Sequence, residues 1–285
     1  DHRDLHSFPT RRSSDLLCSV IGNDQRGQEF LQLLKDDGIS GEGILQSESR
    51  ITTTKFRIIG NKVQMLRVDE EMDTDLNDRE VERMLVKIRE LMQRLPISVV
   101  IFQDYNKGVL TRRLIEDVIK LANSQGVPVV VDPKKKNFDA YRGVDLFKPN
   151  LKELREGLKI DIASGEIDSI RSAVTRLQES QSIRSVMVTL SEAGVYLNEK
   201  ADGTADEVLV PAHLRNIADV SGAGDTVISV ASLCRALGTS SWLTAALSNL
   251  AGGLVCEFVG VVPVNRQRLM TEAMELLTDS GKEIV

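Results

Sequence analysis

The sequence of 285 residues has little cysteine and no excess of basic residues. Its formal net charge is −6, so no general positive surface is available for phosphates, which argues against nucleic-acid or membrane-surface binding. The three cysteines, Cys18, Cys234 and Cys256, stand too far apart for a zinc or disulfide pattern. We expect Cys234 and Cys256, which lie in apolar stretches, to be buried free thiols of a cytoplasmic protein.

Long apolar runs are also missing. No stretch approaches the ~18–20 apolar residues that span a bilayer, and no apolar segment near the start resembles a signal peptide. Internal repeats and low-complexity tracts are absent from the sequence as well. A hydrophobic content of 41% still allows a large core, and α/β chains of this length often form one domain.

The first sixteen residues, DHRDLHSFPTRRSSDL, have neither a helical nor a strand period. Because SFPTRRSSDL resembles a translated sequencing-adapter oligonucleotide, we expect residues 1–16 to be a non-native leader that replaces native sequence before Leu17. A genuine disordered, charged leader is the alternative. From Leu17 the pattern is orderly and begins with the apolar run LLCSVIG.

The next part of the chain predicts a helix and a β-hairpin. An apolar stripe after residue 24 predicts a helix that stops at Gly38. Two β-rich runs, ITTTKFRII and KVQMLRV, flank Gly60-Asn61 and predict a hairpin over residues 51–68. Its many polar side chains indicate one solvated face, which suits a lid better than a central strand.

From about residue 75, helical patterns alternate with continuous Val/Ile runs, which indicates a parallel sheet covered on both faces. The expected fold class is therefore α/β. The predicted helices are 76–95, 111–126, 169–180, 223–237, 241–258 and 265–278. The predicted strands are 98–104, 127–133, 145–150, 185–191, 194–199 and 207–212.

The segment DVSGAGDTV, residues 219–227, opens the helix at 223–237. Glycines at a helix start let an anion approach the unpaired N–H groups. The carboxylate of Asp225 would repel that anion, so its presence indicates a base that takes a hydroxyl proton. Helix capping by Asp225 is the equal alternative. The segment is not a Walker A sequence, which needs GxxxxGK[ST].

DVSGAGDTV resembles the C-terminal signature of the ribokinase/phosphofructokinase-B family of sugar kinases. Three further stretches fit in the family's order: VVVDPKKKNFDAYRGVDLFKPNLKEL, VTLSEAGVYL and SNLAGGLVCEFVG. The resemblance runs from Leu17 to about Leu277. It implies a ribokinase-like parallel-sheet sandwich with helices on both faces and a small β lid.

The chain resembles one subgroup of the family more closely than the others. This resemblance is carried by the segments TTTKFRIIGNKVQMLRVDEE, QDYNKGVLT and VDPKKKNFDAYRG. Members of this subgroup phosphorylate the anomeric hydroxyl of D-glycero-β-D-manno-heptose 7-phosphate, toward ADP-heptose for the lipopolysaccharide core. Relatives often carry a fused nucleotidyltransferase with a His-x-Gly-His motif. His213 is the only histidine after residue 6, so we expect a kinase alone. The resemblance implies ATP and Mg²⁺, a monovalent cation as a further candidate, and a homodimer joined through the lid.

In this resemblance Asp225 is the general base, and the amides of Gly222, Ala223 and Gly224, with that of Asp225, form an anion hole for the γ-phosphoryl group. Asn150 and Glu153 would organise Mg²⁺ through water, although PNLKEL also fits a plain capping box, and both roles are compatible. The implied ATP- and Mg²⁺-binding residues are Asn150, Leu151, Lys152, Glu153, Thr189, Ser191 and Asn249. For the last three, ordinary structural hydroxyls and a surface amide are nearly equal alternatives.

Four residues are candidates for the sugar phosphate. Lys55 and Arg57 lie two apart on a predicted strand and so face one side, where a solvated face is the alternative. Asp104 and Lys107 follow a strand, where α/β enzymes place ligand-binding residues. The run 134–136, Lys-Lys-Lys, fits a solvated loop better than a phosphate clamp, although one of the three could lie near the nucleotide phosphates.

The chain also departs from the family pattern. The family's first strand, part of the lid and a Gly-Gly-Ala-rich sugar-binding segment are not found before Leu17. We therefore expect an open sheet edge and an incomplete acceptor site. Two alternatives stay open: another sugar or sugar-phosphate kinase of the family, or an inactive nucleotide-binding fragment. Asp225 favours an enzyme, because a binding module has no need of a base.

Overall fold

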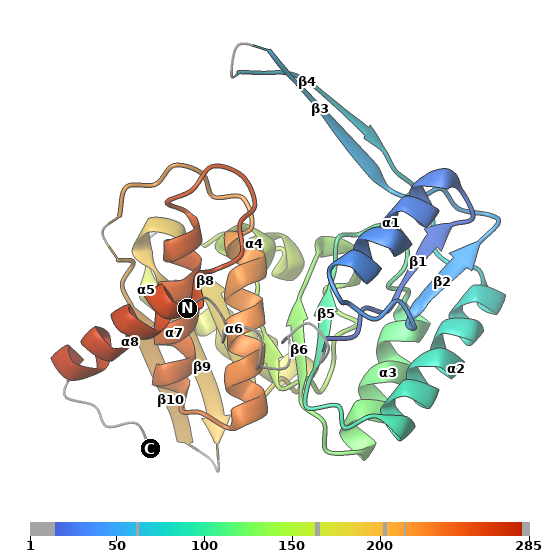
Figure 1. The fold of residues 1–285 in the computed structure, drawn as a ribbon. Coiled ribbons are helices and arrows are strands. Elements are labelled where there is room, and N and C mark those ends of the chain that lie inside the picture. The colour runs from blue at the N-terminus through green and yellow to red at the C-terminus, as the bar shows by residue number, and fades with distance from the viewer. Residues whose placement is uncertain (1–14, 61–62, 163–165, 202–203, 214, 281–285) are drawn as a thin grey trace, which may run out of the picture. The chain divides into compact units, whose positions relative to one another are not determined.

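The computed structural model describes residues 15–280, apart from 61–62, 163–165, 202–203 and 214 (Figure 1). Within the chain there are two compact units, 1–96 with 106–118, and 97–105 with 119–285. Most of the expected leader lies outside the described residues and stays a prediction. None of the helices in the described ranges combines the length and apolarity needed to cross a bilayer.

The first unit contains a two-stranded parallel sheet, a hairpin and helices. Its elements are β1 (Ser19–Gly22), α1 (Gln25–Asp36), β2 (Ile44–Ser47), β3 (Thr54–Gly60), β4 (Val63–Glu70), α2 (Asp78–Arg94) and the first part of α3 (Arg112–Ser124). Helix α1 begins where the Asp24 side chain accepts a hydrogen bond from Gly27 N, and the predicted stop at Gly38 is confirmed by its φ of 69°. Strand β2, which pairs with β1, was not predicted.

The predicted hairpin is confirmed as the antiparallel pair β3–β4, which projects from the first unit (Figure 1). Asn61 of the expected turn lies outside the described residues. One face of the hairpin carries the cross-strand pairs Phe56–Val68 and Ile58–Leu66, all four of them exposed. The hairpin therefore presents an apolar face as well as a polar one.

The second unit contains the main sheet. Its elements are β5 (Val100–Gln103), the rest of α3, β6 (Val129–Asp132), η2 (Lys135–Asn137), β7 (Leu146–Phe147), α4 (Leu151–Leu158), α5 (Ile167–Gln181), β8 (Ser185–Thr189), η3 (Ser191–Ala193), β9 (Val195–Ala201), β10 (Thr204–Val210), α6 (Ala223–Leu237), α7 (Ser241–Val255) and α8 (Arg266–Ser280). The strand order is β10-β9-β8-β7-β6-β5. The bounds of α6 agree with the sequence prediction, whereas α7 ends earlier than residue 258.

The prediction of a parallel sheet needs one correction, because the sheet is mixed. Strands β5 to β8 are parallel, but β9 and β10 are antiparallel to their neighbours. The connection from β8 to β9 is the short turn η3, closed by Gly194 with a φ of 92°. A turn of this length can join only antiparallel strands, since a parallel neighbour requires a long crossover.

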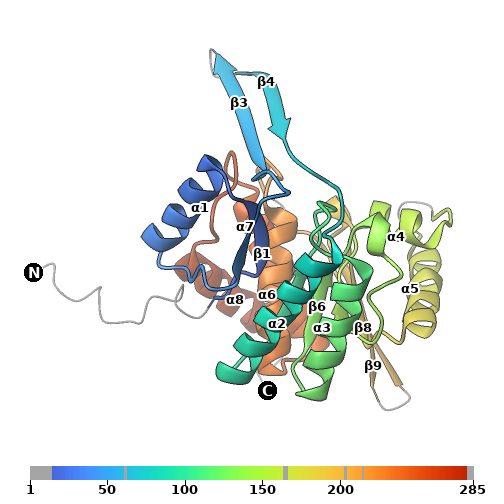
Figure 2. The ribbon, with the colours of Figure 1, turned by 90° about the vertical axis from the view of Figure 1, so that its right-hand side faces the viewer.

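Helices cover both faces of this sheet, with α6 and α7 on one side and α4 and α5 on the other (Figure 2). Buried apolar side chains of β6 to β9 pack against small residues of α6 and α7, such as Ala231, Ala245 and Ala246. A Cβ atom at Gly252 of α7 would lie 2.6 Å from Cγ2 of Val227, so the two helices approach closely there.

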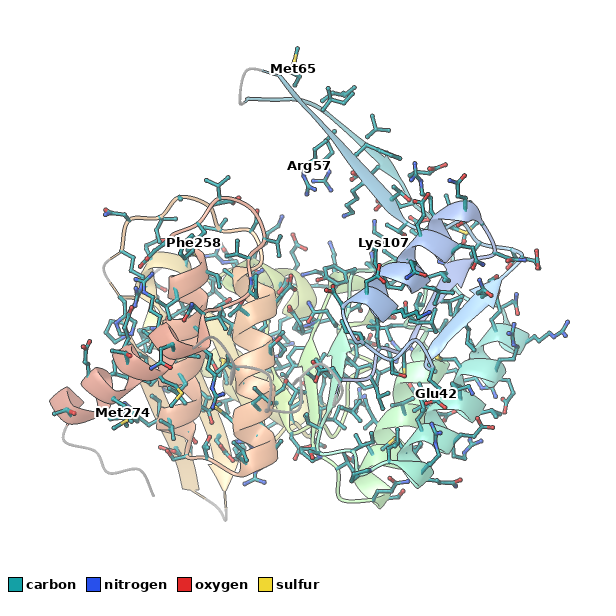
Figure 3. The ribbon with its side chains drawn as sticks, in the orientation of Figure 1. Glu42, Arg57, Met65, Lys107, Phe258 and Met274 are labelled. Atoms are coloured by element: carbon teal, nitrogen blue, oxygen red, sulfur yellow. The ribbon has the colours of Figure 1, made fainter. Side chains whose placement is uncertain are left out.

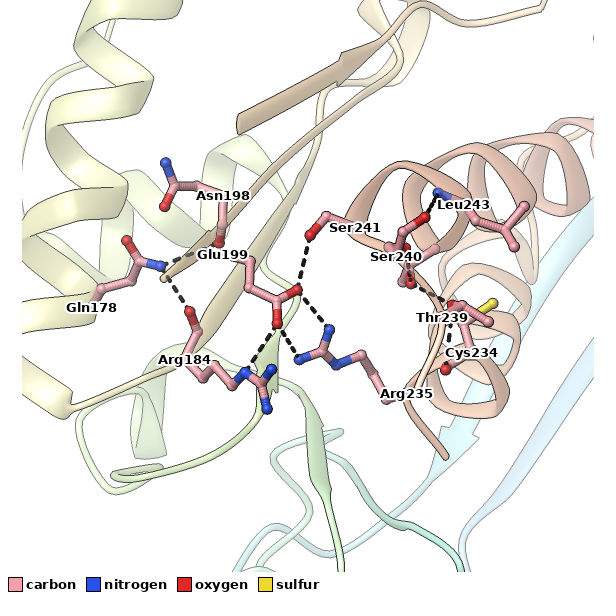
Figure 4. Close-up of polar contacts among 11 residues, drawn as sticks. Gln178, Arg184, Asn198, Glu199, Cys234, Arg235, Thr239, Ser240, Ser241 and Leu243 are labelled. Atoms are coloured by element: carbon pink, nitrogen blue, oxygen red, sulfur yellow. Dashed lines mark hydrogen bonds and ion pairs between the residues drawn. The ribbon is translucent and has the colours of Figure 1, made fainter. Parts of the chain in front are cut away.

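A buried carboxylate joins β9 to the far end of α6 (Figure 4). Glu199 accepts two hydrogen bonds from Arg235, at 2.8 and 3.0 Å, and one from Ser241 of α7 at 2.9 Å. Arg184 lies 3.0 Å from the same carboxylate. Burial alone would raise the pKa of Glu199, but these donors and charges lower it to about 2.

Candidate active site

The glycine-rich turn forms the N-terminus of α6. Gly222 is the N-cap residue with a φ of 81°, a conformation that favours glycine. The N–H groups of Gly222, Gly224 and Asp225 have no acceptor within the described part of the chain. Ala223 differs from the expected anion hole, because its N–H donates to Val220 O at 3.2 Å. The amides open to an anion are therefore those of Gly222, Gly224 and Asp225.

A second carboxylate, which sequence reasoning did not assign, holds this turn in place. Asp219 Oδ1 accepts from the N–H and the hydroxyl of Ser221, at 3.0 and 2.9 Å. Asp219 Oδ2 accepts from Gly260 N at 2.9 Å. The hydrogen bond from Gly260, followed by those from Ser221, lowers the pKa of Asp219. The first aspartate of DVSGAGD thus has a structural role at the site.

Asp225 faces the end of β5 rather than the backbone of its own helix. Its Oδ1 atom accepts from Gln103 Nε2 at 2.9 Å and from the Tyr105 hydroxyl at 2.8 Å. Burial, with the hydrogen bond to Asp225, raises the pKa of Tyr105 to about 12, so this hydroxyl keeps its proton at neutral pH. The hydrogen bonds described for the Asp225 carboxylate thus come from Gln103 and Tyr105 and not from its own helix, and its role as a base stays a prediction.

A buried ion pair lies next to this cluster. Gln103 Nε2 also donates to Asp132 Oδ2 at 3.0 Å, and Lys148 Nζ lies 3.1 Å from Asp132 Oδ1. The second contact lacks hydrogen-bond alignment and is an ion pair, with the Lys148 side chain 3% exposed. The Lys148 ammonium lies 3.9 Å from where a Cβ atom at Gly224 would be. A positive charge therefore lies beside the open amides.

Asn150 and Glu153 form the capping box of α4 that the sequence predicted as one of two roles. Asn150 Oδ1 accepts from Glu153 N at 2.8 Å, and Glu153 Oε2 accepts from Asn150 N at 2.9 Å. The other two predicted residues of this turn are Leu151, which is half-buried, and Lys152, which is exposed and pairs with Glu156. The capping role is confirmed, and the role toward Mg²⁺ stays a prediction.

Lys134 corrects the expectation of a solvated lysine run. Its ammonium donates to Glu153 Oε1, whereas Lys135 and Lys136 are exposed. Burial opposes the charge of Lys134, but the hydrogen bond and charge of Glu153 raise its pKa. The ion pair holds this lysine at the N-terminus of α4, because Glu153 is fixed there by the capping box.

The described residues contain no group of three His, Cys, Asp or Glu side chains that could hold a metal ion. Both Glu153 oxygens are already engaged, by Lys134 and by Asn150 N. Glu153 therefore fits a magnesium site only through water molecules or phosphate oxygens, which is a common arrangement for Mg²⁺.

The three candidates for the nucleotide groove lie on separate elements of the second unit. Thr189, at the end of β8, forms a bridge with Asn150 and donates from its N–H to Pro149 O at 3.1 Å. Ser191 is exposed in η3 with a φ of 54°. Asn249 of α7 donates to Pro211 O at 2.9 Å. Only Thr189 is brought next to Asn150 by these contacts.

The cationic candidates for the sugar phosphate lie in the first unit. Lys55 and Arg57 lie on one side of β3 as expected, and Figure 3 shows Arg57 on the hairpin. Their cross-strand neighbours are Asp69 and Arg67, respectively. Lys107 forms an ion pair with Glu71, and its carbonyl accepts from Arg50 at 2.7 Å.

Asp104 is placed differently from the prediction. It is 1% exposed, and its Oδ2 atom accepts from the Tyr141 hydroxyl at 2.8 Å and from Asn137 at 3.3 Å. Burial, followed by the charge of Asp104, raises the pKa of Tyr141. These contacts place the Asp104 carboxylate in the core, which corrects the expected contact with the sugar.

Sequence reasoning missed the residues that surround Asp225, namely Gln103, Tyr105, Asp132 and Lys148. A signal existed in the alternation of β5: if Asp104 points into the core, its two neighbours point the other way. Lys148 also stands two positions before Asn150. No local pattern indicated its burial beside Gly224, because that contact is tertiary.

Known proteins resemble the chain in sequence. Residues 14–267 match the model of pfkB family carbohydrate kinases. The chain is 34% identical over 260 residues to the bifunctional protein HldE of Desulfatibacillum aliphaticivorans, which covers 91% of this chain and 52% of that protein. It is 38% identical over 224 residues to HldE of Helicobacter pylori, covering 79% of this chain and 47% of that protein. The chain thus spans about half the length of these curated relatives.

Solved structures share the fold. Phosphofructokinase-2 from Escherichia coli in complex with potassium superposes with a TM-score of 0.72 at 17% identity, over 90% of this chain and 80% of that one. Arabidopsis thaliana ribokinase complexed with ribose and ATP gives a TM-score of 0.67 at 18% identity, with the same coverage. The fold is ribokinase-like, as the sequence predicted. With the family match over most of its length, the chain belongs to the pfkB family of carbohydrate kinases.

Proposed function

We propose that the chain transfers the terminal phosphoryl group of ATP to the anomeric hydroxyl of D-glycero-β-D-manno-heptose 7-phosphate. The observation that carries this proposal is the position of Asp225. Its carboxylate is held at Oδ1 by Gln103 and Tyr105, in the same helical turn as the open amides of Gly224 and Asp225. The heptose follows from the resemblance on the hairpin, the QDYNKG segment and VDPKKK, together with the HldE relatives.

In the proposed reaction the terminal phosphate lies against the N–H groups of Gly224 and Asp225, and the Lys148 ammonium balances its charge. Asp225 Oδ2 takes the proton of the sugar hydroxyl. The sugar oxygen forms a bond to the γ-phosphorus, and the bond from that phosphorus to the bridging oxygen breaks. The electron pair leaves with ADP.

Mg²⁺ would neutralise phosphate charge when bound, and Asn150 and Glu153 would orient it through water. We keep Leu151, Lys152, Thr189, Ser191 and Asn249 as proposed nucleotide contacts and a monovalent cation as a proposed cofactor. Three exposed apolar residues could form a surface against which the adenine ring of the nucleotide packs. These are Val220, Val259 and Val261. Val261 Cγ1 lies 3.2 Å from where a Cβ atom at Gly222 would be, so this surface borders the turn.

Lys55, Arg57 and Lys107 are proposed to hold the 7-phosphate, since a doubly charged anion favours several cations. The cytoplasm is the proposed compartment, in keeping with the three free cysteines. A homodimer joined through the β3–β4 hairpin completes the proposal, because its apolar face is exposed.

The test is ADP release over a panel of heptose 7-phosphate, ribose and fructose phosphates, for the unchanged chain and for Asp225→Asn. We expect heptose 7-phosphate to be preferred and the variant to lose about 10²-fold or more in kcat. The matched control is Asp78→Asn, an exposed acid in the first turn of α2. Preference for ribose would contradict the heptose assignment. Full turnover by Asp225→Asn would contradict the proposed role of Asp225 as the general base.

A further inference from the structure

Two side chains at the end of β5 converge on one oxygen of Asp225. The Gln103 amide and the Tyr105 hydroxyl both donate to Oδ1, at 2.9 and 2.8 Å. We propose that Gln103 and Tyr105 are positioning residues, which fix the Asp225 carboxylate so that Oδ2 is the atom that accepts the proton. This inference rests on the proposed function of Asp225 as the base.

Strand alternation explains why these two residues act together. Gln103 ends β5, and successive side chains point to opposite faces, so residues 103 and 105 share a side and Asp104 takes the other. Asp104 is accordingly 1% exposed and bound to Tyr141. One short segment thus supplies a core acceptor on one face and two donors for Asp225 on the other.

The Gln103 amide has a fixed orientation. Its nitrogen carries two hydrogens, and it donates to Asp225 Oδ1 and to Asp132 Oδ2. A flipped amide would place its oxygen against two carboxylates. Asp132 is itself held by the buried ammonium of Lys148, which lies beside Gly224. The base is therefore connected through Gln103 and Asp132 to the cation next to the open amides.

Both donors bind Oδ1 and so fix the orientation of the carboxylate, which leaves Oδ2 as the atom that can take a proton. The charged and titratable groups around this cluster are Asp132, Lys148 and Tyr105. Tyr105 keeps its proton at neutral pH and so remains a donor. Loss of one donor should leave the carboxylate free to rotate away from the sugar hydroxyl.

The experiment compares Tyr105→Phe and Gln103→Leu with the unchanged chain by kcat and kcat/KM from pH 4 to 9. We expect kcat to fall about tenfold for Tyr105→Phe, with KM for ATP unchanged, because the carboxylate is no longer held toward the sugar hydroxyl. Tyr105 is 56% exposed, so the unfolding midpoint of the Tyr105→Phe variant should equal that of the unchanged chain. Tyr196→Phe, which removes a buried tyrosine hydroxyl from β9, is the control for loss of a hydroxyl elsewhere in the second unit.

A second measurement does not depend on turnover: the ¹³C signal of the Asp225 carboxyl is recorded at one fixed pH in the same variants. A changed chemical shift in Tyr105→Phe, which reports a displaced carboxylate, supports the positioning role. An unchanged signal and an unchanged kcat in both variants would overturn it, even if Asp225→Asn is inactive. Turnover retained by Asp225→Asn would instead remove the proposed function itself, so the two failures are distinguishable.

Discussion

At the scale of single residues, two glycines of the second unit have opposite surroundings. A Cβ atom at Gly224 would meet only Lys148 Nζ, at 3.9 Å, which is an ordinary contact distance. A Cβ atom at Gly252 would lie 2.6 Å from Cγ2 of Val227. Packing therefore requires glycine at 252 but not at 224, where glycine fits the close approach of an anion that we propose.

This contrast gives a prediction for Gly224→Ala and Gly252→Ala. The first should keep its unfolding free energy and lose about tenfold or more in kcat, because its methyl group covers the open amides. The second should lose about 1–3 kcal/mol in unfolding free energy, because α6 and α7 must move apart. Urea unfolding and ADP release measure the two effects. A stable, fully active Gly224→Ala would argue against phosphate binding at this turn.

A second residue-scale prediction separates the two roles of Asn150. Serine retains N-cap function but lacks the amide group, so Asn150→Ser should leave unfolding free energy within about 0.5 kcal/mol. If Asn150 also orients Mg²⁺ and phosphate, KM for MgATP should rise about fivefold or more. Asn77→Ser is the control, because Asn77 forms the same capping box with Glu80 in α2. An equal KM for MgATP in the two variants would show that Asn150 acts only as the N-cap of α4.

At the scale of elements, Glu199 joins β9 to α6 and α7 through Arg235 and Ser241. Its pKa is lowered from 4.5 to about 2, so folding is favoured by the charged form. The resulting stability is fully present above about pH 4.5 and is lost as the pH falls toward 2.

We therefore predict that unfolding free energy falls by about 3 kcal/mol from this group between pH 4.5 and 2. Glu199→Gln should be less stable at pH 7, since it leaves the buried Arg235 without its charge partner, and should show a shallower acid dependence. Chemical unfolding at several pH values measures both. Glu192→Gln, at an exposed site in η3, should retain the dependence of the unchanged chain. If the unfolding free energy of Glu199→Gln fell with pH as steeply as that of the unchanged chain, other carboxylates would be the cause of the acid dependence.

At the scale of the whole molecule, the exposed apolar face of the hairpin bears on assembly. Phe56, Ile58, Leu66 and Val68 form this face, with exposed fractions from 38% to 53%. Burial of such a face against a second copy would be favourable at about 25 cal/mol per Å² of apolar surface.

Ile58→Lys should therefore shift a homodimer toward monomer without changing the helical circular dichroism of the chain. Sedimentation velocity over a concentration series measures the shift. Met274→Lys, at an exposed apolar site of α8, is the control and should not alter association. A dimer of unchanged affinity in Ile58→Lys would place the interface elsewhere.

Much of the fold could be predicted from local patterns. The stripe of α1, the hairpin runs and the Val/Ile strands each correspond to an element close to the expected position. Strand β2 was missed, since its four residues, ILQS, carry no clear period. The antiparallel direction of β9 was missed because the Val/Ile run of a strand does not record the direction of its neighbour; the short turn at Gly194 decides it.

The sequence by itself determined that a glycine-rich turn with Asp225 opens a helix and that Asn150 and Glu153 begin another. These features depend on residues a few positions apart, which interact whenever the helix forms. Only the tertiary structure decided that Gln103 and Tyr105, more than 100 residues away in sequence, hold Asp225, whereas Asp104 enters the core. The physical reason is that strand alternation and sheet packing determine which face of a segment meets a distant helix.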